Sequence, residues 1–223
     1  MDITFDVIKA KVIHLLADDV ATGSDEYGGG PLYGSSYDAN LLRDAVHAAL
    51  DAITIKMWKP QTFDIAGSIS EKDLPDGLLA VEGVYDKTAG IYLPHMNLQA
   101  NQESLIGIAG NAWSLFPHGK ISFINDLGES GAKVYYSSVW NKPEAPDEVI
   151  EPPESSTIAI CLYAASYCLL NKSAGSADIR QYNTKVDSGA PTDIPQKTMS
   201  DFFYRRYELE LQRLPSMEKG NIR

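Results

Sequence analysis

The chain has 223 residues, of which 44% are hydrophobic and 22% charged, and its formal net charge is -11 with a sequence pI near 4.7. This length is enough for one large domain or two small ones with a sizeable core. The acidic charge argues against a broad surface that holds nucleic acid by neutralising phosphates. No apolar run reaches membrane-spanning length, and the first residues lack the basic and apolar regions of a secretory signal, so we expect no membrane partner.

Two amphipathic helices are predicted in the first part of the chain. The first covers residues 4–16, and the second begins after the N-cap Asp38 and continues to Ile53. Residues 21–37 between them are rich in glycine and serine and predict a loop that is mobile or ordered by a partner. His47 falls on the polar face of the second helix, where a solvated side chain is expected. The predicted core stripes are Phe5, Ile8, Val12, Leu15 and Leu16 in the first helix, and Leu41, Leu42, Ala45, Val46, Ala49, Leu50 and Ile53 in the second.

From Gln61 to Trp140 the hydrophobic residues change from helical spacing to alternation, which predicts a β-rich insertion. Turn-forming residues such as Pro75-Asp76-Gly77 separate the alternating runs. We expect a meander of antiparallel strands, with residues 97–111 as a loop or a brief helix. The predicted strands begin near Phe63, Leu79, Ile91, Trp113, Lys120 and Val134.

A proline-rich linker at 141–155 leads into two further predicted helices. The third helix starts after Ser155 or Ser156 and ends near 171–173, before a polar stretch at 174–195. The fourth ends at Pro215. The expected core stripes are Ile158, Cys161, Leu162, Ala165, Cys168 and Leu169 in the third helix, and Met199, Phe203, Tyr207, Leu211 and Leu214 in the fourth.

These segments predict an α+β fold with a discontinuous helical module. Residues 1–60 and 141–223 form a four-helix bundle-like module, and the antiparallel β-rich insertion at 61–140 interrupts it between its second and third helices.

The sequence carries no recognisable catalytic, metal-binding or cofactor-binding set. Its four histidines lack ligand spacing, and Gly28-Gly29-Gly30 lacks the lysine of a phosphate loop. Cys161 and Cys168 lie on a core stripe and are expected to be buried and reduced. We therefore predict that the chain is not an enzyme and needs no cofactor. Paired carboxylates leave a glycoside hydrolase as a less favoured alternative, because such pairs at helix ends or in loops are more often solvated. The pairs are Asp18 with Asp19, Asp25 with Glu26 and Asp147 with Glu148.

Aromatic and arginine side chains at exposed positions favour a protein-interaction role, because these residue types are enriched at interface cores. The alternative, that they cover the core, stays open. The candidates are Tyr27, Tyr33 and Tyr37 in the glycine-rich loop and Phe202, Tyr204, Arg205 and Arg206 on the fourth helix.

The order of these segments resembles the head-to-tail adaptor, or connector, proteins of tailed bacteriophages, in which a β-rich insertion separates the second and third helices of a small bundle. The resemblance rests on architecture and covers most of the chain. It is carried by 41–53, 63–140 and 158–169, by the lead-in Ile150-Glu151-Pro152-Pro153-Glu154-Ser155, and by the aromatic run Phe202-Phe203-Tyr204-Arg205-Arg206-Tyr207.

The resemblance implies a homo-oligomeric ring, commonly twelvefold, beneath the portal protein in the neck of the virion. Such a ring extends the DNA channel and docks a tail or nozzle protein, and an acidic subunit suits passage of genomic DNA without sequence-specific binding. Residues 216–223, with Ile222 and Arg223, become candidate contacts that order on assembly. Another tail-associated or tail-completion protein is the alternative.

Overall fold

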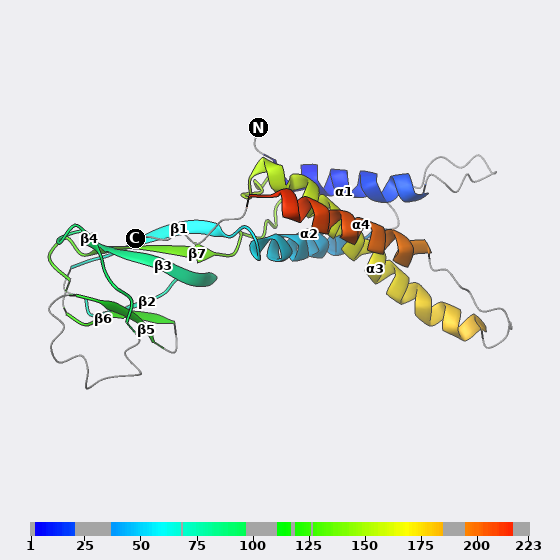
Figure 1. Cartoon of the computed structure of the whole chain (residues 1–223). Helices are drawn as coiled ribbons and strands as arrows, with labels where there is room; N and C mark the ends of the chain where they lie inside the picture. The colour runs from blue at the N-terminus through cyan, green and yellow to red at the C-terminus, as the bar shows by residue number, and fades with distance from the viewer. Residues whose placement is uncertain are drawn as a thin grey trace. The chain divides into compact units, whose positions relative to one another are not determined.

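The computed structural model describes residues 3–20, 37–67, 69–96, 111–116, 119–125, 127–184 and 195–215. Within these ranges the chain forms four α-helices and two antiparallel sheets, which is an α+β fold (Figure 1). Two compact units are present: a helical unit of Met1–Met57 with Trp140–Ser216, and a β unit that contains the intervening Trp58–Val139. No helix in this described part of the chain is long and apolar enough to span a membrane.

The helical unit contains α1 (Phe5–Val20), α2 (Ala39–Thr54), α3 (Thr157–Thr184) and α4 (Pro195–Arg213), with a short 3-10 turn, η2 (Glu154–Ser156), before α3. The predicted N-cap of α2 is confirmed: Asp38 has extended backbone angles, and its side chain accepts a hydrogen bond from the Asn40 amide. Helix α3 contacts each of the other three helices and therefore lies at the centre of the unit.

The helical core is built from most residues of the predicted stripes. Four members are only partly buried and pack against the core, namely Leu15, Leu41, Met199 and Leu211, and Ile158 is 60% exposed. Full burial of an aliphatic side chain contributes about 1.5–3 kcal/mol, so these stripes hold the helices together. The fully buried members include Phe5, Ile8, Val12, Leu16, Ala45, Val46, Ala49, Leu50, Ile53, Cys168 and Leu169.

Helices α3 and α4 are joined by a buried pair of hydroxyls. Ser166 Oγ donates to the Ser200 carbonyl oxygen at 3.0 Å, and Ser200 Oγ donates to the Ser166 carbonyl oxygen at 2.9 Å. Both serines are buried, so each hydroxyl needs the partner that the facing helix supplies.

Helix α3 is longer than the sequence pattern predicts. We expected it to end near 171–173, but it continues to Thr184. Residues 174–184 contain no proline and include alanine, glutamine and arginine, which favour helix even without an apolar stripe.

The β unit contains two sheets and is not the expected meander. The four-stranded sheet has the order β1-β7-β3-β4, and the three-stranded sheet has the order β2-β6-β5. Strand β7 therefore lies between β1 and β3, which precede it by more than forty residues in the sequence. This order differs from the expected one because alternation indicates which face of a strand is buried but not which strand it pairs with. The strands are β1 (Lys59–Ile65), β2 (Glu71–Asp73), β3 (Leu78–Asp86), β4 (Ile91–Tyr92), β5 (Trp113–Phe116), β6 (Lys120–Phe123) and β7 (Ala132–Ser138).

The two sheets share one hydrophobic core within the β unit. Ile65, Val84 and Val134 come from the four-stranded sheet, and Ile121 and Phe123 come from the three-stranded sheet. Pairing of β1 with β7 runs from Lys59 opposite Ser138 to Ile65 opposite Ala132 without a register shift. This core is separate from that of the helical unit.

Candidate functional site

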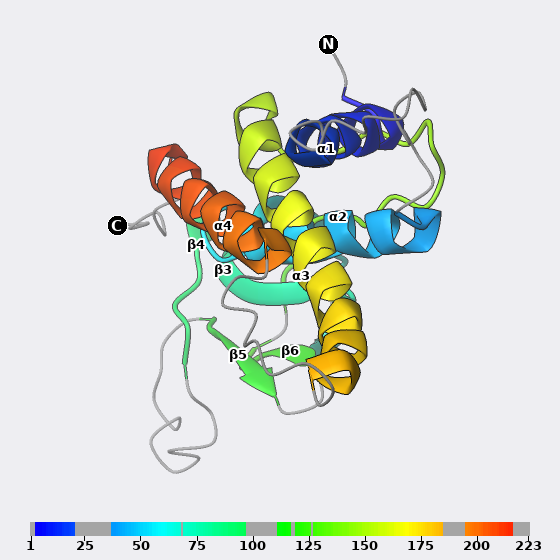
Figure 2. The ribbon, with the colours of Figure 1, turned by 90° about the vertical axis from the view of Figure 1, so that its right-hand side faces the viewer.

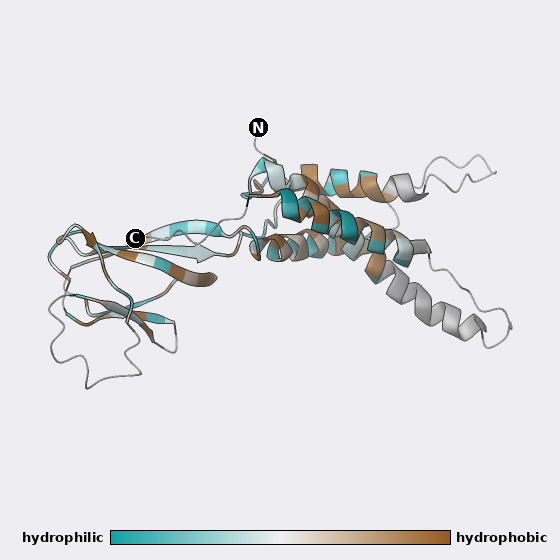
Figure 3. Cartoon of the chain, viewed as in Figure 1, coloured by the Kyte–Doolittle hydropathy of each residue, from teal (hydrophilic) through white to brown (hydrophobic). Residues whose placement is uncertain are grey.

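The outward face of α4 holds four of the predicted interface residues. The side chain of Phe202 is 47% exposed and that of Tyr204 is 44% exposed, while Arg205 and Arg206 are also exposed. The guanidinium of Arg206 lies 5.8 Å from the centroid of the Phe202 ring, a cation–π distance. Hydrophobic and hydrophilic residues mix on the visible side of α4 (Figure 3), and its exposed aromatic and arginine side chains belong to the residue types that are enriched at protein interfaces.

The other predicted interface residues are not gathered on this face. Tyr37 is half-buried and packs against the helical core, so for this residue the core-covering alternative applies. Tyr27, Tyr33, Ile222 and Arg223 lie outside the described residues.

Three tyrosine rings connect the outward face of α4 to the core. The ring of Tyr163 on α3 lies 5.0 Å from that of Tyr207 and 6.2 Å from that of Tyr204, measured between centroids. Burial raises the pKa of Tyr207 to about 12, and it also raises the pKa of Tyr163. The ring of Tyr204 therefore contacts Tyr163 on one side and is partly exposed to solvent on the other.

An apolar groove lies beside α4, and its position was not predicted. It has a volume of about 630 Å³ and is lined by α1, α3 and α4. Its apolar walls include Val7, Leu15 and Ile158, and Lys11 and Arg206 also line it. The sequence signal was present, because Val7 and Leu15 form a second apolar stripe on α1, apart from the core stripe of Phe5, Ile8, Val12 and Leu16.

Cys161 lines the groove but lacks the properties of a nucleophile. Burial raises the pKa of its thiol to about 11, an effect that outweighs the opposing influence of Lys11. Burial also raises the pKa of Cys168 to about 12. A thiol with so high a pKa holds little reactive thiolate at neutral pH. Among the described residues, no three histidine, cysteine or acidic side chains group closely enough to hold a metal ion.

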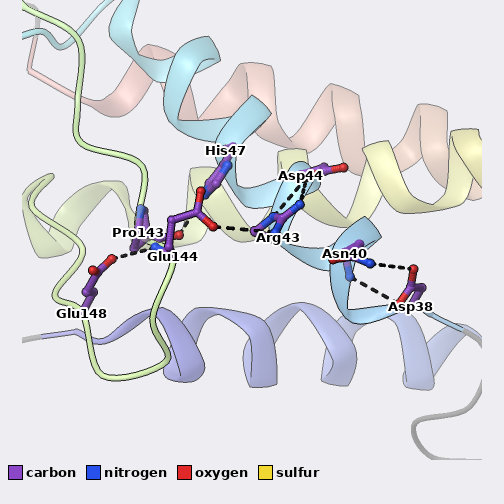
Figure 4. Close-up of polar contacts among 8 residues, drawn as sticks. All are labelled: Asp38, Asn40, Arg43, Asp44, His47, Pro143, Glu144 and Glu148. Carbon is purple, nitrogen blue, oxygen red and sulfur yellow. Dashed lines mark hydrogen bonds and ion pairs between the residues drawn. The ribbon is translucent and has the colours of Figure 1, made fainter.

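The segment Asn141–Glu151, here named the strap, is fastened to α2 by His47 and Arg43 (Figure 4). His47 Nε2 lies 2.8 Å from the carbonyl oxygen of Pro143, which can only accept, so the imidazole donates. The expectation of a solvated His47 is therefore wrong: it is half-buried and stacks on Phe5 with centroids 6.2 Å apart. Arg43 also pairs with Glu144 at 3.6 Å.

The strap also caps the first turn of α1. The amide of Phe5 donates to the Glu148 carbonyl oxygen at 2.9 Å, and the amide of Asp6 donates to the Pro146 carbonyl oxygen at 3.1 Å. These first-turn amides have no partner inside the helix, so the strap supplies their acceptors. Fastened at α2 and at α1, the strap is a defined part of the surface.

The carboxylates of the strap are engaged in holding its shape. Glu148 Oε2 accepts a hydrogen bond from the Glu144 amide at 2.6 Å, and Glu151 Oε1 accepts one from Asn141 Nδ2 at 2.9 Å. Asp147, the other acid of this predicted pair, is exposed. Asp25 and Glu26, the second candidate pair for glycoside hydrolysis, lie outside the described residues.

The β unit has its own aromatic surface, a tyrosine patch of Tyr85, Tyr92 and Tyr135. The ring of Tyr92 lies 5.3 Å from that of Tyr85 and 6.0 Å from that of Tyr135. Lys133 Nζ lies 5.6 Å from the centroid of the Tyr135 ring. Tyrosines that are partly exposed beside a cation are typical of protein-binding surfaces.

The comparisons with known proteins give no family. No protein-family model matches the chain, and no curated protein sequence matches it.

Proposed function

We propose that the chain is a head-to-tail adaptor of a tailed bacteriophage, a structural virion protein that forms a ring beneath the portal. In this proposal the four helices of each subunit pack as a bundle-like module and form the body of the ring. The ring contains twelve copies, the number common in the adaptor family. The β unit provides contacts to the portal or to a tail or nozzle protein. Genomic DNA passes through the ring without sequence-specific binding, and the protein needs no catalytic residue or cofactor.

The observation that carries the proposal is the position of the β unit in the sequence. Trp58–Val139 separates α2 from α3, so a compact β unit interrupts a helical unit whose halves share one core. This is the segment order on which the resemblance to the adaptor proteins rests. The units have separate cores, so each can carry a different contact in an assembly.

Two surface features support an assembly role. The outward face of α4 and the tyrosine patch expose aromatic side chains beside cations, a composition suited to protein contacts. The net charge of -11 would also repel DNA phosphates and so favour sliding over binding.

The proposal is tested with the full chain and a portal protein from the same genome. Negative-stain microscopy and native mass spectrometry are expected to show a ring that binds the portal. A chain that remains monomeric and ignores the portal would contradict the proposal.

A matched pair of variants tests the role of the β unit. Tyr92→Ser is expected to weaken binding to the portal or to the tail protein about tenfold, because it removes an exposed aromatic ring from the tyrosine patch. Leu79→Ser removes an exposed apolar side chain elsewhere on the β unit and is expected to leave binding unchanged.

The second candidate is another tail-associated or tail-completion protein that uses the same exposed surfaces. Locating the chain in a density map of the virion separates the two, because an adaptor lies directly beneath the portal. A glycoside hydrolase is the least favoured candidate, since Glu148 and Glu151 accept hydrogen bonds within the strap. A single substitution that abolishes a measured hydrolase activity would revive it; the residues to substitute are Asp25, Glu26, Asp147 and Glu148.

A further inference from the structure

We propose that the apolar groove of one copy binds the strap of a second copy, with Val149 entering the groove and Asp147 facing Lys11 and Arg206. The proposed contact rests on the proposed function, in which copies of the chain assemble into a ring. The groove and the strap would then be the two surfaces of the helical unit that join neighbouring subunits.

The groove has the size and the lining of a site for apolar side chains. Its volume of about 630 Å³ falls within the range of ordinary binding pockets. Ile158, which lines the groove, is 60% exposed, although it belongs to the stripe expected to be core. Covering such surface is favourable by about 25 cal/mol per Å² of apolar area removed from water.

The charges around the groove select an acidic occupant. Lys11, His14 and Arg206 line it, and no acidic residue is among the described residues of the lining. Two grooves placed face to face would bring Lys11 and Arg206 of both copies together, which disfavours a symmetric groove-to-groove dimer. The chain as a whole carries a net charge of -11, so acidic segments of another copy are available as partners.

The strap supplies an apolar side chain between acids. Val149 is 48% exposed, and Asp147, Glu148 and Glu151 beside it are exposed as well. The hydrogen bond between His47 and Pro143, together with the capping of α1, holds this segment in place before it meets a partner. A segment ordered in advance loses little entropy on binding.

The two surfaces lie on different flanks of the helical unit. The strap contacts α1 and α2, whereas the groove is lined by α1, α3 and α4. Figure 2 shows the trace of the strap beside α1 and α2, on the side away from α4. A contact between two different patches is head-to-tail, and such contacts generate rings when their rotation closes.

A charge exchange within the full chain tests the contact. Arg206→Glu is expected to raise the dissociation constant for self-assembly about tenfold, and Asp147→Arg is expected to do the same. The double variant, which exchanges the two charges, is expected to restore assembly. Sedimentation velocity measures the oligomer, and circular dichroism checks that each variant is folded.

Controls separate this contact from general effects of charge. Lys197→Glu reverses another exposed cation of α4, one that does not line the groove, and it is expected to assemble normally. Failure of the double variant to recover, or an equal loss with Lys197→Glu, would overturn the proposed contact.

Portal binding, measured separately, distinguishes this inference from the proposed function. A wild-type chain that binds the portal but stays monomeric overturns the groove contact and leaves the portal role in place. A chain that assembles through the groove but does not bind the portal overturns the portal role and leaves the groove contact in place.

Discussion

The indole nitrogen of Trp140 donates a hydrogen bond to the carbonyl oxygen of Met57 at 2.7 Å. The chain leaves the helical unit after Met57 and returns to it at Trp140, so this bond closes the base of the β insertion. Both side chains are buried in the helical core. The two ends of the insertion are therefore held together by the helical unit itself.

Removing this bond is expected to destabilise the helical unit. Trp140→Phe should lower the free energy of unfolding by about 1–2 kcal/mol, because it leaves the Met57 carbonyl without its donor. Trp140→Ala should cost about 3–5 kcal/mol, since a cavity is added. Urea unfolding followed by far-ultraviolet circular dichroism measures both. Trp58→Phe, at a half-buried position nearby, is the control, and an equal loss there would contradict the role of the Trp140 bond.

A glycine before β7 is expected to be essential to the β unit. Gly131 has a φ of +68°, and a Cβ at this position would lie 2.0 Å from the Ile65 carbonyl oxygen. Because that oxygen belongs to the backbone, Gly131→Ala should cost more than about 3 kcal/mol, through steric overlap added to the strain of a positive φ. Thermal unfolding monitored by near-ultraviolet circular dichroism measures the loss.

The matched control for this substitution is Gly119→Ala. Gly119 has a similar φ of +71°, but a Cβ there meets no atom of the described residues within 4 Å. Its cost should therefore be about 1 kcal/mol, the strain of the positive φ alone. Similar losses in the two variants would show that the approach to Ile65 is unimportant.

The imidazole of His47 is expected to control the opening of the strap. His47→Ala removes the donor to Pro143 and the stacking on Phe5, so it should destabilise the strap by about 1–2 kcal/mol. The amides of Phe5 and Asp6, which donate to the strap, should then exchange with deuterium about tenfold faster. Arg213→Ala, at the exposed end of α4, is the control. Unchanged exchange at Phe5 would show that His47 does not fasten the strap.

The helical core could largely be predicted from the sequence because its signal is local. The buried positions of α2 follow the helical period, and Asp38 marks its start. Strand β2, Glu71–Asp73, could not be predicted, because all three residues are charged and exposed and no alternation marks them. The position of β7 between β1 and β3 depends on pairing across a long sequence separation, which periodicity does not encode.

The candidate surfaces were harder to predict than the core. Residues Phe202, Arg205 and Arg206 were selected by residue type and are exposed on α4. The groove was missed because Ile158 shares its period with the core stripe, and only the arrangement of α1 and α4 leaves it uncovered. The half-buried position of His47 could not be predicted either, because its partner Pro143 lies far away in the sequence and helical spacing gives no sign of such a contact.

The buried phenol of Tyr207 is expected to make the helical unit sensitive to alkali. Its pKa is raised from 10.0 to about 12, mainly by burial, so the folded protein keeps a proton that the unfolded chain releases. The stability that the Tyr207 phenol contributes is full below about pH 10 and is lost as the pH rises towards about 12, by up to about 2 kcal/mol. Urea unfolding at about pH 9 and about pH 11 measures this loss.

Tyr207→Phe removes the titrating group and should reduce the alkaline loss. Part of the loss should remain, because the raised pKa values of Cys161 and Cys168 act in the same direction. Tyr204→Phe, whose ring is 44% exposed, is the control and should keep the wild-type dependence. Since a buried phenol ionises only when it reaches water, the phenolate absorbance of Tyr207 should appear together with unfolding. An alkaline loss that is equal in Tyr207→Phe and in the wild type would assign the effect to other groups.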